Sequence, residues 1–175
     1  VGIHPWYLTE ANAEEQLQWL YQAVKQPDVV AVGECGLDKL RGASMSLQQE
    51  VFRACVSLAE QMHLPLVVHA VKCTEELFRI HKELKPQMPW IIHGFRGRKE
   101  VAEQYLKRGF YLSFGEHFHD EALRSTPLER LLLETDESRL SMEEICRKAA
   151  SVYGLPAEIL AARITSNAQK VLFLQ

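Results

Sequence analysis

Cysteine is scarce in this sequence, and its few copies are not paired in any recognisable spacing. The four lie far apart and form no CxxC motif: Cys35, Cys55, Cys73 and Cys146. Cysteines with such spacing are typical of reduced thiols rather than of a disulfide framework. We therefore expect a cytoplasmic protein.

Long apolar runs and an excess of positive charge are also missing. No stretch of about 18 apolar residues occurs, and no signal peptide is visible, so we expect no membrane association. The formal net charge is −3, so no overall basic field indicates a nucleic-acid partner. A nuclease is not excluded, because a bound metal can supply positive charge locally. No obligate protein partner is evident.

The sequence further lacks a GxGxxG motif after its first strand and a GxxxxGK[ST] motif anywhere, which disfavours nucleotide-binding folds. Instead, short apolar runs alternate with helical patterns. The runs predict strands at residues 1–3, 29–33, 65–70, 90–94, 110–115 and 130–136. They show no polar/apolar alternation, so they should be buried on both faces, as in parallel sheets. The spacing is that of β–α units and leaves an open doubly wound sheet or a (β/α) barrel.

The helical patterns have readable ends. They cover residues 10–24, 46–63, 74–84, 98–108, 141–153 and 156–173. Ser46 with Gln49, and Ser141 with Glu144, have the spacing of a capping box. Gly154 is placed to end the helix that Ser141 begins.

Polar groups follow the apolar runs at one end. The six predicted strands end on His4, Glu34, His69, His93, Ser113 and Asp136. In an α/β barrel the chemistry lies at the carboxyl ends of the strands, so these side chains can converge. Taken singly, His69 fits a core histidine, Glu34 a partner for Arg or Lys, and His4 and Asp136 turn residues. All these roles would have to coincide at one end of successive strands.

Two imidazoles and two carboxylates form a donor set for a borderline divalent ion such as Zn²⁺, Mn²⁺ or Ni²⁺. Such an ion would offset the cost of placing Glu34 beside an apolar strand. His117 and His119 form an HxH pair, which can bind zinc but is more typical here of a polar loop. Cys35 could line the site, although no His–Asp relay is evident to activate it.

Six segments, taken in order, resemble the TatD-type metal-dependent deoxyribonucleases. They are "GIHPW", "AVGECGLD", "LPLVVHA", "WIIHGFRG", "GFYLSF" and "LLLETD", which together span residues 1 to about 138. The resemblance implies an α/β fold, a TIM-type (β/α) barrel of the amidohydrolase-like group. It also implies a two-metal site with nuclease or phosphodiesterase activity.

The resemblance carries over to individual residues. Glu34 corresponds to a carboxylate that bridges the two metals, and His69 and His93 to ligands of the second metal. Asp136 corresponds to a ligand of the first metal that also contacts the nucleophilic water, so Glu34 and Asp136 would be catalytic. His4 corresponds to a histidine near the scissile phosphate. Arg96 stands where small or polar residues are common, and either binds a phosphate or forms a surface pair.

The family's first strand carries an Asp-x-His-x-His segment that this chain does not contain. We therefore expect the barrel to lack its first one or two strands and the first metal site to be incomplete. On this interpretation residues 1–175 form a single metal-dependent hydrolase domain that is incomplete at its N-terminus. The loop after Asp136 also departs from the family, because it runs directly into a helix.

The sequence thus predicts a divalent-metal-dependent hydrolase of phosphoester bonds, resembling a TatD-like DNase or exonuclease. It would use two divalent metal ions (Zn, Mn, Ni or Mg) and act on DNA or a small phosphoester. Two alternatives stay open: an amidohydrolase-type enzyme that cleaves another bond, and a non-catalytic member that binds a metal or nucleotide.

Overall fold

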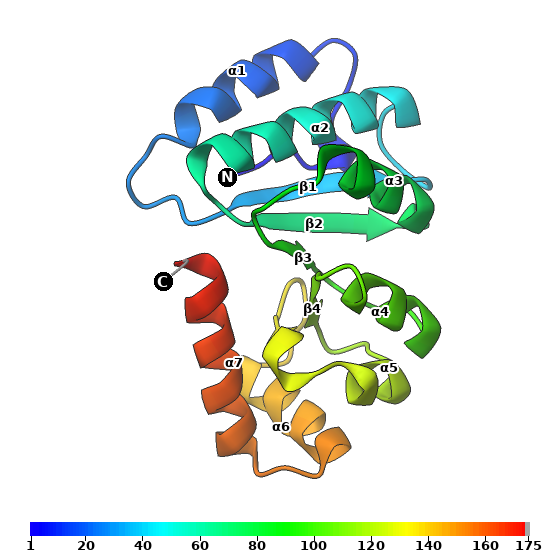
Figure 1. Ribbon diagram of the computed structural model, residues 1–175, viewed down its shortest axis with the longest axis vertical. Helices are drawn as coiled ribbons and strands as arrows, with labels where there is room; N and C mark the ends of the chain where they lie inside the picture. Colours follow the sequence, from blue (N-terminus) through cyan, green and yellow to red (C-terminus); the bar gives the residue numbers. More distant parts are fainter. Residues whose placement is uncertain (174–175) are drawn as a thin grey trace. The chain divides into compact units, whose positions relative to one another are not determined.

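The computed structural model describes residues 1–173 and has an α/β architecture (Figure 1). The chain divides into two compact units, Val1–Trp90 and Ile91–Gln175, here called unit 1 and unit 2. Each unit combines parallel strands with helices that follow them in the chain. Among the described residues, no helix is both long and apolar enough to cross a bilayer.

Unit 1 begins with a short 3₁₀ helix and contains two long strands. Its elements are the 3₁₀ helix Pro5–Tyr7, α1 (Ala13–Ala23), β1 (Val32–Asp38), α2 (Met45–Met62), β2 (Leu66–Val71) and α3 (Thr74–Leu84). β1 and β2 are parallel, with Gly36 opposite His69 in the register. This register places the end of β1 and the histidine of β2 side by side.

Helix α2 supplies much of the core of unit 1. Its buried positions recur every three or four residues, at Val51, Phe52, Cys55 and Ala59 among others. This periodicity turns one apolar face towards the interior. The helix begins at Ser44, whose hydroxyl accepts a hydrogen bond from the backbone N–H of Leu47 at 3.3 Å. The cap therefore lies two residues earlier than the spacing of Ser46 and Gln49 predicts.

Unit 2 contains shorter strands and more helices. Its elements are β3 (Trp90–Ile92), α4 (Lys99–Leu106), β4 (Tyr111–Phe114), α5 (Asp120–Ser125), the 3₁₀ helix Leu128–Arg130, β5 (Leu131–Leu133), α6 (Met142–Tyr153) and α7 (Ala157–Leu172). β4 is parallel to both β3 and β5. All three strands are buried along their length, as their largely apolar sequences predict.

Most predicted elements are present, with revised ends. Helix α3 has the predicted bounds, and α6 begins with the predicted capping box of Ser141 and Glu144 and ends at Gly154. Helix α5 lies in a stretch that the sequence pattern did not predict to be helical. No strand is assigned at residues 1–3, although the carbonyl of Val1 accepts a hydrogen bond from the N–H of Gly33 at 2.7 Å.

The largest revision concerns β1. The apolar run predicts a strand at 29–33, whereas β1 spans Val32–Asp38. The strand continues past the apolar run, and Gly36 is required inside it. A Cβ atom at Gly36 would lie 2.0 Å from the carbonyl oxygen of His69. The strand continues because glycine permits this close approach to β2.

Candidate metal centres

Two groups of histidine and carboxylate side chains could each hold a metal ion. The first lies in unit 1 and contains His4, Glu34 and His69, and the second lies in unit 2 and contains His93, Glu134 and Asp136. In each group, one donor atom from every residue lies within 4.8 Å of the others. We call them cluster 1 and cluster 2.

In cluster 1, a buried carboxylate holds the imidazole of His69. The Nε2 atom of His69 lies 3.0 Å from Oδ2 of Asp38. The same oxygen accepts a 2.6 Å hydrogen bond from the indole N–H of Trp6. The other oxygen, Oδ1, accepts hydrogen bonds from the backbone N–H groups of Leu40 and Arg41 at 2.8 and 3.1 Å. Asp38 thus has donors on both oxygens.

The charge of Asp38 fixes the tautomer of His69. Desolvation by burial acts to raise the pKa of Asp38, but hydrogen bonds from Trp6 and His69 outweigh it and hold that pKa below its usual range. An ionised carboxylate only accepts hydrogen bonds, so Nε2 of His69 carries the proton. In the neutral ring the lone pair is then on Nδ1, the atom through which His69 would bind a metal ion. A carboxylate that orients a histidine in this way is a common support of metal ligands.

His4 presents the other ring nitrogen, Nε2, to the cluster. Its Nδ1 accepts a 3.2 Å hydrogen bond from the backbone N–H of Trp6, so a neutral ring carries its proton on Nε2. That atom lies 3.5 Å from Oε2 of Glu34. In this tautomer His4 offers an N–H donor to the cluster and no lone pair. The geometry therefore suits an anion contact better than metal ligation.

A buried glutamine fixes the loop next to cluster 1. Gln48, in the first turn of α2, donates from Nε2 to the carbonyls of Asp38, Arg41 and Ala43 at 3.0, 3.2 and 2.8 Å. Its Oε1 accepts a 2.7 Å hydrogen bond from the N–H of Asp38. One side chain thus sets the path of the backbone from the end of β1 to the start of α2.

In cluster 2, Glu134 holds His93. The Nδ1 atom of His93 and Oε1 of Glu134 are 3.3 Å apart, and Oε1 also accepts a 2.6 Å hydrogen bond from the backbone N–H of Gly94. If Nδ1 carries the proton of this contact, Nε2 is the atom through which His93 would bind a metal ion. Asp136 is exposed and has a left-handed backbone, with φ of 45°. It lies three residues beyond the end of β5.

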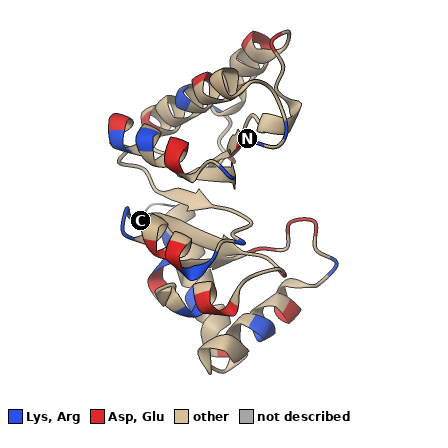
Figure 2. Cartoon of the chain, turned by 90° about the vertical axis from the view of Figure 1, so that its right-hand side faces the viewer, with Lys and Arg blue, Asp and Glu red and all other residues tan. Residues whose placement is uncertain are grey.

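Cluster 2 opens into a cavity of about 210 Å³. Its lining includes Arg96, His117, Glu134, Asp136 and Ser138. The cavity brings together the loops that follow β3, β4 and β5. The β5 loop contains Glu134, Asp136 and Glu137, whereas Figure 2 shows acidic and basic residues mixed over the rest of the chain.

Glu116 joins two of these loops. Its Oε2 accepts a 2.6 Å hydrogen bond from the hydroxyl of Ser138 in the β5 loop. Its Oε1 lies 2.8 Å from Nε2 of His117, and its carbonyl accepts a 2.9 Å hydrogen bond from Nζ of Lys148 in α6. These contacts hold the β4 loop against the wall of the cavity.

The predicted site residues fall into both clusters. The structure brings Glu34 together with His69 and His4, and His93 together with Asp136, while Arg96 lines the cavity of cluster 2. Sequence reasoning missed Asp38, Gln48 and Glu134. A signal for Asp38 existed, because residues two or four apart on a strand point to the same face. Asp38 and Glu34 have that spacing. Glu134 stands two residues before Asp136, but its partners lie on a distant loop.

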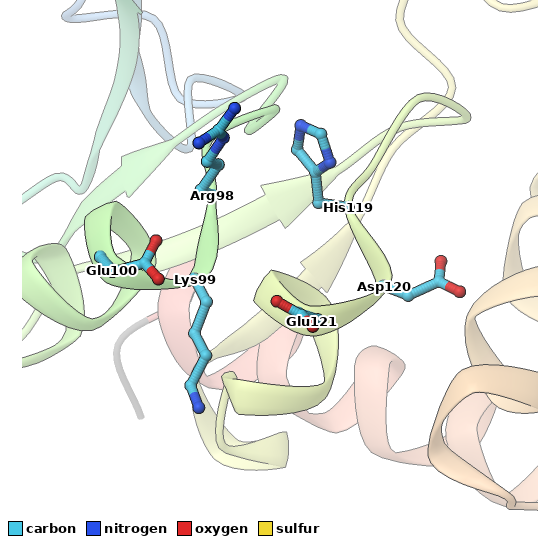
Figure 3. Close-up of a pocket in the computed structure, with 6 residues that line it drawn as sticks. All are labelled: Arg98, Lys99, Glu100, His119, Asp120 and Glu121. Atoms are coloured by element: carbon cyan, nitrogen blue, oxygen red, sulfur yellow. The ribbon is translucent and has the colours of Figure 1, made fainter.

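The remaining candidates contribute differently. Burial, with a further effect of the neighbouring Cys55, raises the pKa of Cys35 well above its usual value, so Cys35 is a protonated structural thiol. The two histidines of the HxH pair separate, because His117 lines the cavity of cluster 2 and His119 lines another cavity of about 450 Å³. In Figure 3, Arg98 and His119 lie on one side of that cavity. It is lined equally by acidic and basic residues, and we assign it no function.

The donor sets fit a borderline divalent metal ion. Each cluster combines an imidazole nitrogen, oriented by its own carboxylate, with a further carboxylate, Glu34 in cluster 1 and Asp136 in cluster 2. Zinc, manganese and nickel accept such mixed nitrogen and oxygen ligands, whereas calcium sites are built from oxygen alone.

Comparisons with known proteins identify relatives of this chain. It is 37% identical over 145 residues to the uncharacterized metal-dependent hydrolase YabD of Bacillus subtilis, covering 78% of this chain and 56% of that protein. It is 31% identical over 200 residues to the 3'-5' ssDNA/RNA exonuclease TatD of Pantoea ananatis, covering 99% of this chain and 76% of that protein. The chain thus spans from about half to three quarters of the length of these relatives.

A solved structure shares the fold. The crystal structure of YJJV, a TatD homologue from Escherichia coli, matches with a TM-score of 0.84 at 24% identity, covering 100% of this chain and 76% of that chain. The likeness confirms the predicted fold class, an α/β fold of the TIM-barrel type. A sequence profile described as TatD related DNase matches residues 1–173. With this match, the chain belongs to the TatD related DNase family.

Proposed function

We propose that the protein is a metal-dependent hydrolase that cleaves phosphodiester bonds of single-stranded nucleic acid. One observation carries the proposal: in each cluster a carboxylate contacts one ring nitrogen of a histidine, and donor atoms of that histidine and of a further carboxylate lie within 4.8 Å of one another. The names of the relatives, a metal-dependent hydrolase and a ssDNA/RNA exonuclease, support the same activity. A small phosphoester is the alternative substrate within this class.

In this proposal the metal ligands are those that the sequence predicts. Nδ1 of His69 and a carboxylate oxygen of Glu34 would hold one ion, and Nε2 of His93 and a carboxylate oxygen of Asp136 would hold another. When bound, divalent cations such as Zn²⁺, Mn²⁺, Ni²⁺ or Mg²⁺ acidify an attacking water and stabilise charge on the phosphoryl oxygens. Asp38 and Glu134 keep the two imidazoles in the required tautomers.

Other side chains would act on the substrate directly. The Nε2–H of His4 is oriented by the backbone of Trp6 and donates a hydrogen bond to a phosphate oxygen. The exposed Arg96 lines the cavity of cluster 2 with Asp136, where its guanidinium pairs with a phosphate. Asp136 and Glu34 would accept the proton of the attacking water.

We further propose that residues 1–175 belong to one hydrolase domain, incomplete at its N-terminus in this chain, and that the protein acts in the cytoplasm. All four cysteines are free and buried, which supports a reducing compartment.

The decisive experiment measures cleavage of an end-labelled single-stranded oligonucleotide with added Mn²⁺ or Mg²⁺. Glu34→Gln and Asp136→Asn should each lower the rate at least about 100-fold, as expected for loss of a ligand or base. Glu50→Gln is the control, because Glu50 is an exposed carboxylate on α2 that belongs to neither cluster. Unchanged cleavage in the first two variants would contradict the assignment. Stoichiometric metal binding without cleavage would favour a non-catalytic metal-binding protein.

A further inference from the structure

An exposed aromatic ring lies directly beside cluster 1. Tyr7 is 68% exposed, although it ends a 3₁₀ helix whose first residue, Pro5, is buried. The ring centroids of Tyr7 and His4 are 5.6 Å apart. The ring of His4 in turn lies 4.5 Å from that of His69. Only the ring of His4 thus separates Tyr7 from His69, and both histidines belong to the cluster that would surround a bound phosphate.

The backbone beneath Tyr7 is held firmly. Its carbonyl accepts hydrogen bonds from the side-chain amides of Asn12 and Gln16 at 2.9 and 3.0 Å. Its N–H donates to the carbonyl of His4 at 3.1 Å, and the next residue, Leu8, is 2% exposed. An exposed ring on a fixed backbone loses little conformational entropy when a ligand stacks on it.

A cation lies on the same part of unit 1. The guanidinium of the exposed Arg41 stands 4.1 Å from the centroid of the Trp6 ring. Its backbone is held by Asp38 and Gln48. Gly42 keeps this loop against the 3₁₀ helix, because a Cβ atom there would lie 2.2 Å from the carbonyl oxygen of Pro5. The loop that carries Arg41 and the segment that carries Tyr7 therefore form one fixed surface.

We propose that Tyr7 and Arg41 form a nucleotide subsite next to cluster 1. Tyr7 stacks on a nucleobase of a single-stranded substrate, and Arg41 pairs with a neighbouring phosphate. An aromatic ring beside a cation is the arrangement with which proteins bind single strands without reading sequence. The subsite rests on the proposed function, and it makes a nucleic acid with accessible bases the substrate in place of a small phosphoester.

The test compares two substrates that differ only in their bases. One is a single-stranded DNA oligonucleotide, and the other is the same length of tetrahydrofuran abasic backbone. Tyr7→Ala should raise the KM for the first at least about fivefold, the lower limit for a stacked base. It should leave the KM for the abasic strand unchanged. Tyr7→Phe, which keeps the ring, should behave as the unaltered protein does.

Tyr21→Ala is the matched control, because Tyr21 is 41% exposed on α1 of the same unit and is expected to affect neither substrate. An equal rise of KM on both substrates would show a structural role for Tyr7 and overturn the proposal. No change on either substrate would also overturn it.

Binding separates failure of the subsite from failure of the proposed function. Affinity for both strands is measured by fluorescence anisotropy with Ca²⁺ in place of Mn²⁺, and it requires no turnover. If the unaltered protein cleaves neither strand, the proposed function fails. The subsite still predicts weaker binding of the DNA strand alone in Tyr7→Ala, and equal affinities in that variant and the unaltered protein would overturn it.

The role of Arg41 has its own measurement. Arg41→Gln should reduce the slope of log affinity against log salt concentration by about one phosphate contact, on both strands. Arg79→Gln is the control, because Arg79 on α3 is already hydrogen-bonded to Gln49, and its slope should match that of the unaltered protein. An unchanged slope in Arg41→Gln would remove Arg41 from the subsite.

Discussion

In both clusters a carboxylate orients the histidine, but the two carboxylates differ in burial and in their hydrogen bonds. In unit 1 the supporting carboxylate, Asp38, is 3% exposed, and both of its oxygens accept hydrogen bonds. In unit 2 the supporting carboxylate, Glu134, has a side chain that is 19% exposed. Within the described residues, its two hydrogen bonds both end on Oε1. His69 is therefore held by a buried carboxylate with hydrogen bonds on both oxygens. His93 is held by a carboxylate that uses one oxygen, Oε1, for both of its hydrogen bonds.

The difference shows that the carboxylate that orients a metal ligand can itself be held by many contacts or by few. The surroundings of Asp38 extend to Trp6, the β1–α2 loop and the register of β1 with β2. Glu134 depends on one contact with the turn after β3. We expect cluster 1 to resist rearrangement and cluster 2 to adapt to what it binds.

The largest effect should come from adding a side chain between β1 and β2, next to cluster 1. Gly36→Ala would place a Cβ atom 2.0 Å from the carbonyl oxygen of His69, so β1 and β2 must separate. We expect the free energy of unfolding to fall by about 3 kcal/mol. Urea denaturation followed by circular dichroism measures it. Gly109→Ala in unit 2 is the control, since no atom lies within 4 Å of a Cβ there, and its cost should be the strain of a positive φ, about 1 kcal/mol.

The second test exchanges each supporting carboxylate for its amide. In Asp38→Asn the new NH₂ group must face N–H donors, because both oxygens of Asp38 accept hydrogen bonds. In Glu134→Gln the amide oxygen can keep the position of Oε1 while its NH₂ faces the cavity. We expect Asp38→Asn to weaken Mn²⁺ binding about 10- to 100-fold, and Glu134→Gln to weaken it less.

Isothermal titration calorimetry gives both affinities, and the melting temperature of each variant without metal reports any loss of folding. Equal losses of affinity in the two variants would end the distinction between a rigid and an adaptable cluster.

The smallest effect concerns two hydrogen-bonded carboxylates outside the clusters, the half-buried Glu76 of unit 1 and the exposed Glu144 of unit 2. A hydrogen bond with Lys39 is the main cause that lowers the pKa of Glu76 in unit 1. Hydrogen bonds from Ser141 lower the pKa of Glu144 in unit 2. A carboxyl whose pKa is depressed by folding contributes stability above its unfolded pKa, and loses it as the pH falls through the folded value.

Glu76→Gln and Glu144→Gln should therefore slightly lower the melting temperature at pH 7 and leave it nearly unchanged at pH 2. The measurement is a melting curve at each pH, with Glu137→Gln as a surface reference. A difference that persists at pH 2 would assign the loss to packing instead of charge.

Local patterns predicted elements whose boundaries are set locally. Helix α3 and the capping box of α6 are of this kind, because their caps and apolar spacing lie within a few residues of each other. The end of β1 was wrong because it depends on the contact between Gly36 and His69, which lie far apart in sequence.

The same reason separates the site residues that were predicted from those that were missed. His69, His93 and Asp136 stand out because a polar group follows an apolar run. Gln48 and Glu134 act on backbone groups of other loops, so nothing in their local sequence marks them. The proximity of His93 to Asp136 in cluster 2 was expected from the parallel strand order, which collects strand ends at one edge.

The position of Gln48 limits how this protein can vary in length. Its amide reaches Asp38, Arg41 and Ala43 from the first turn of α2. Since each helical residue turns the side chain by about 100°, inserting one residue between Ser44 and Gln48 would point the amide away from the loop. Insertions and deletions at this join should be rare among active relatives, even though it is an exposed connection of the kind that usually tolerates them. Loop length and helix phase would have to change together.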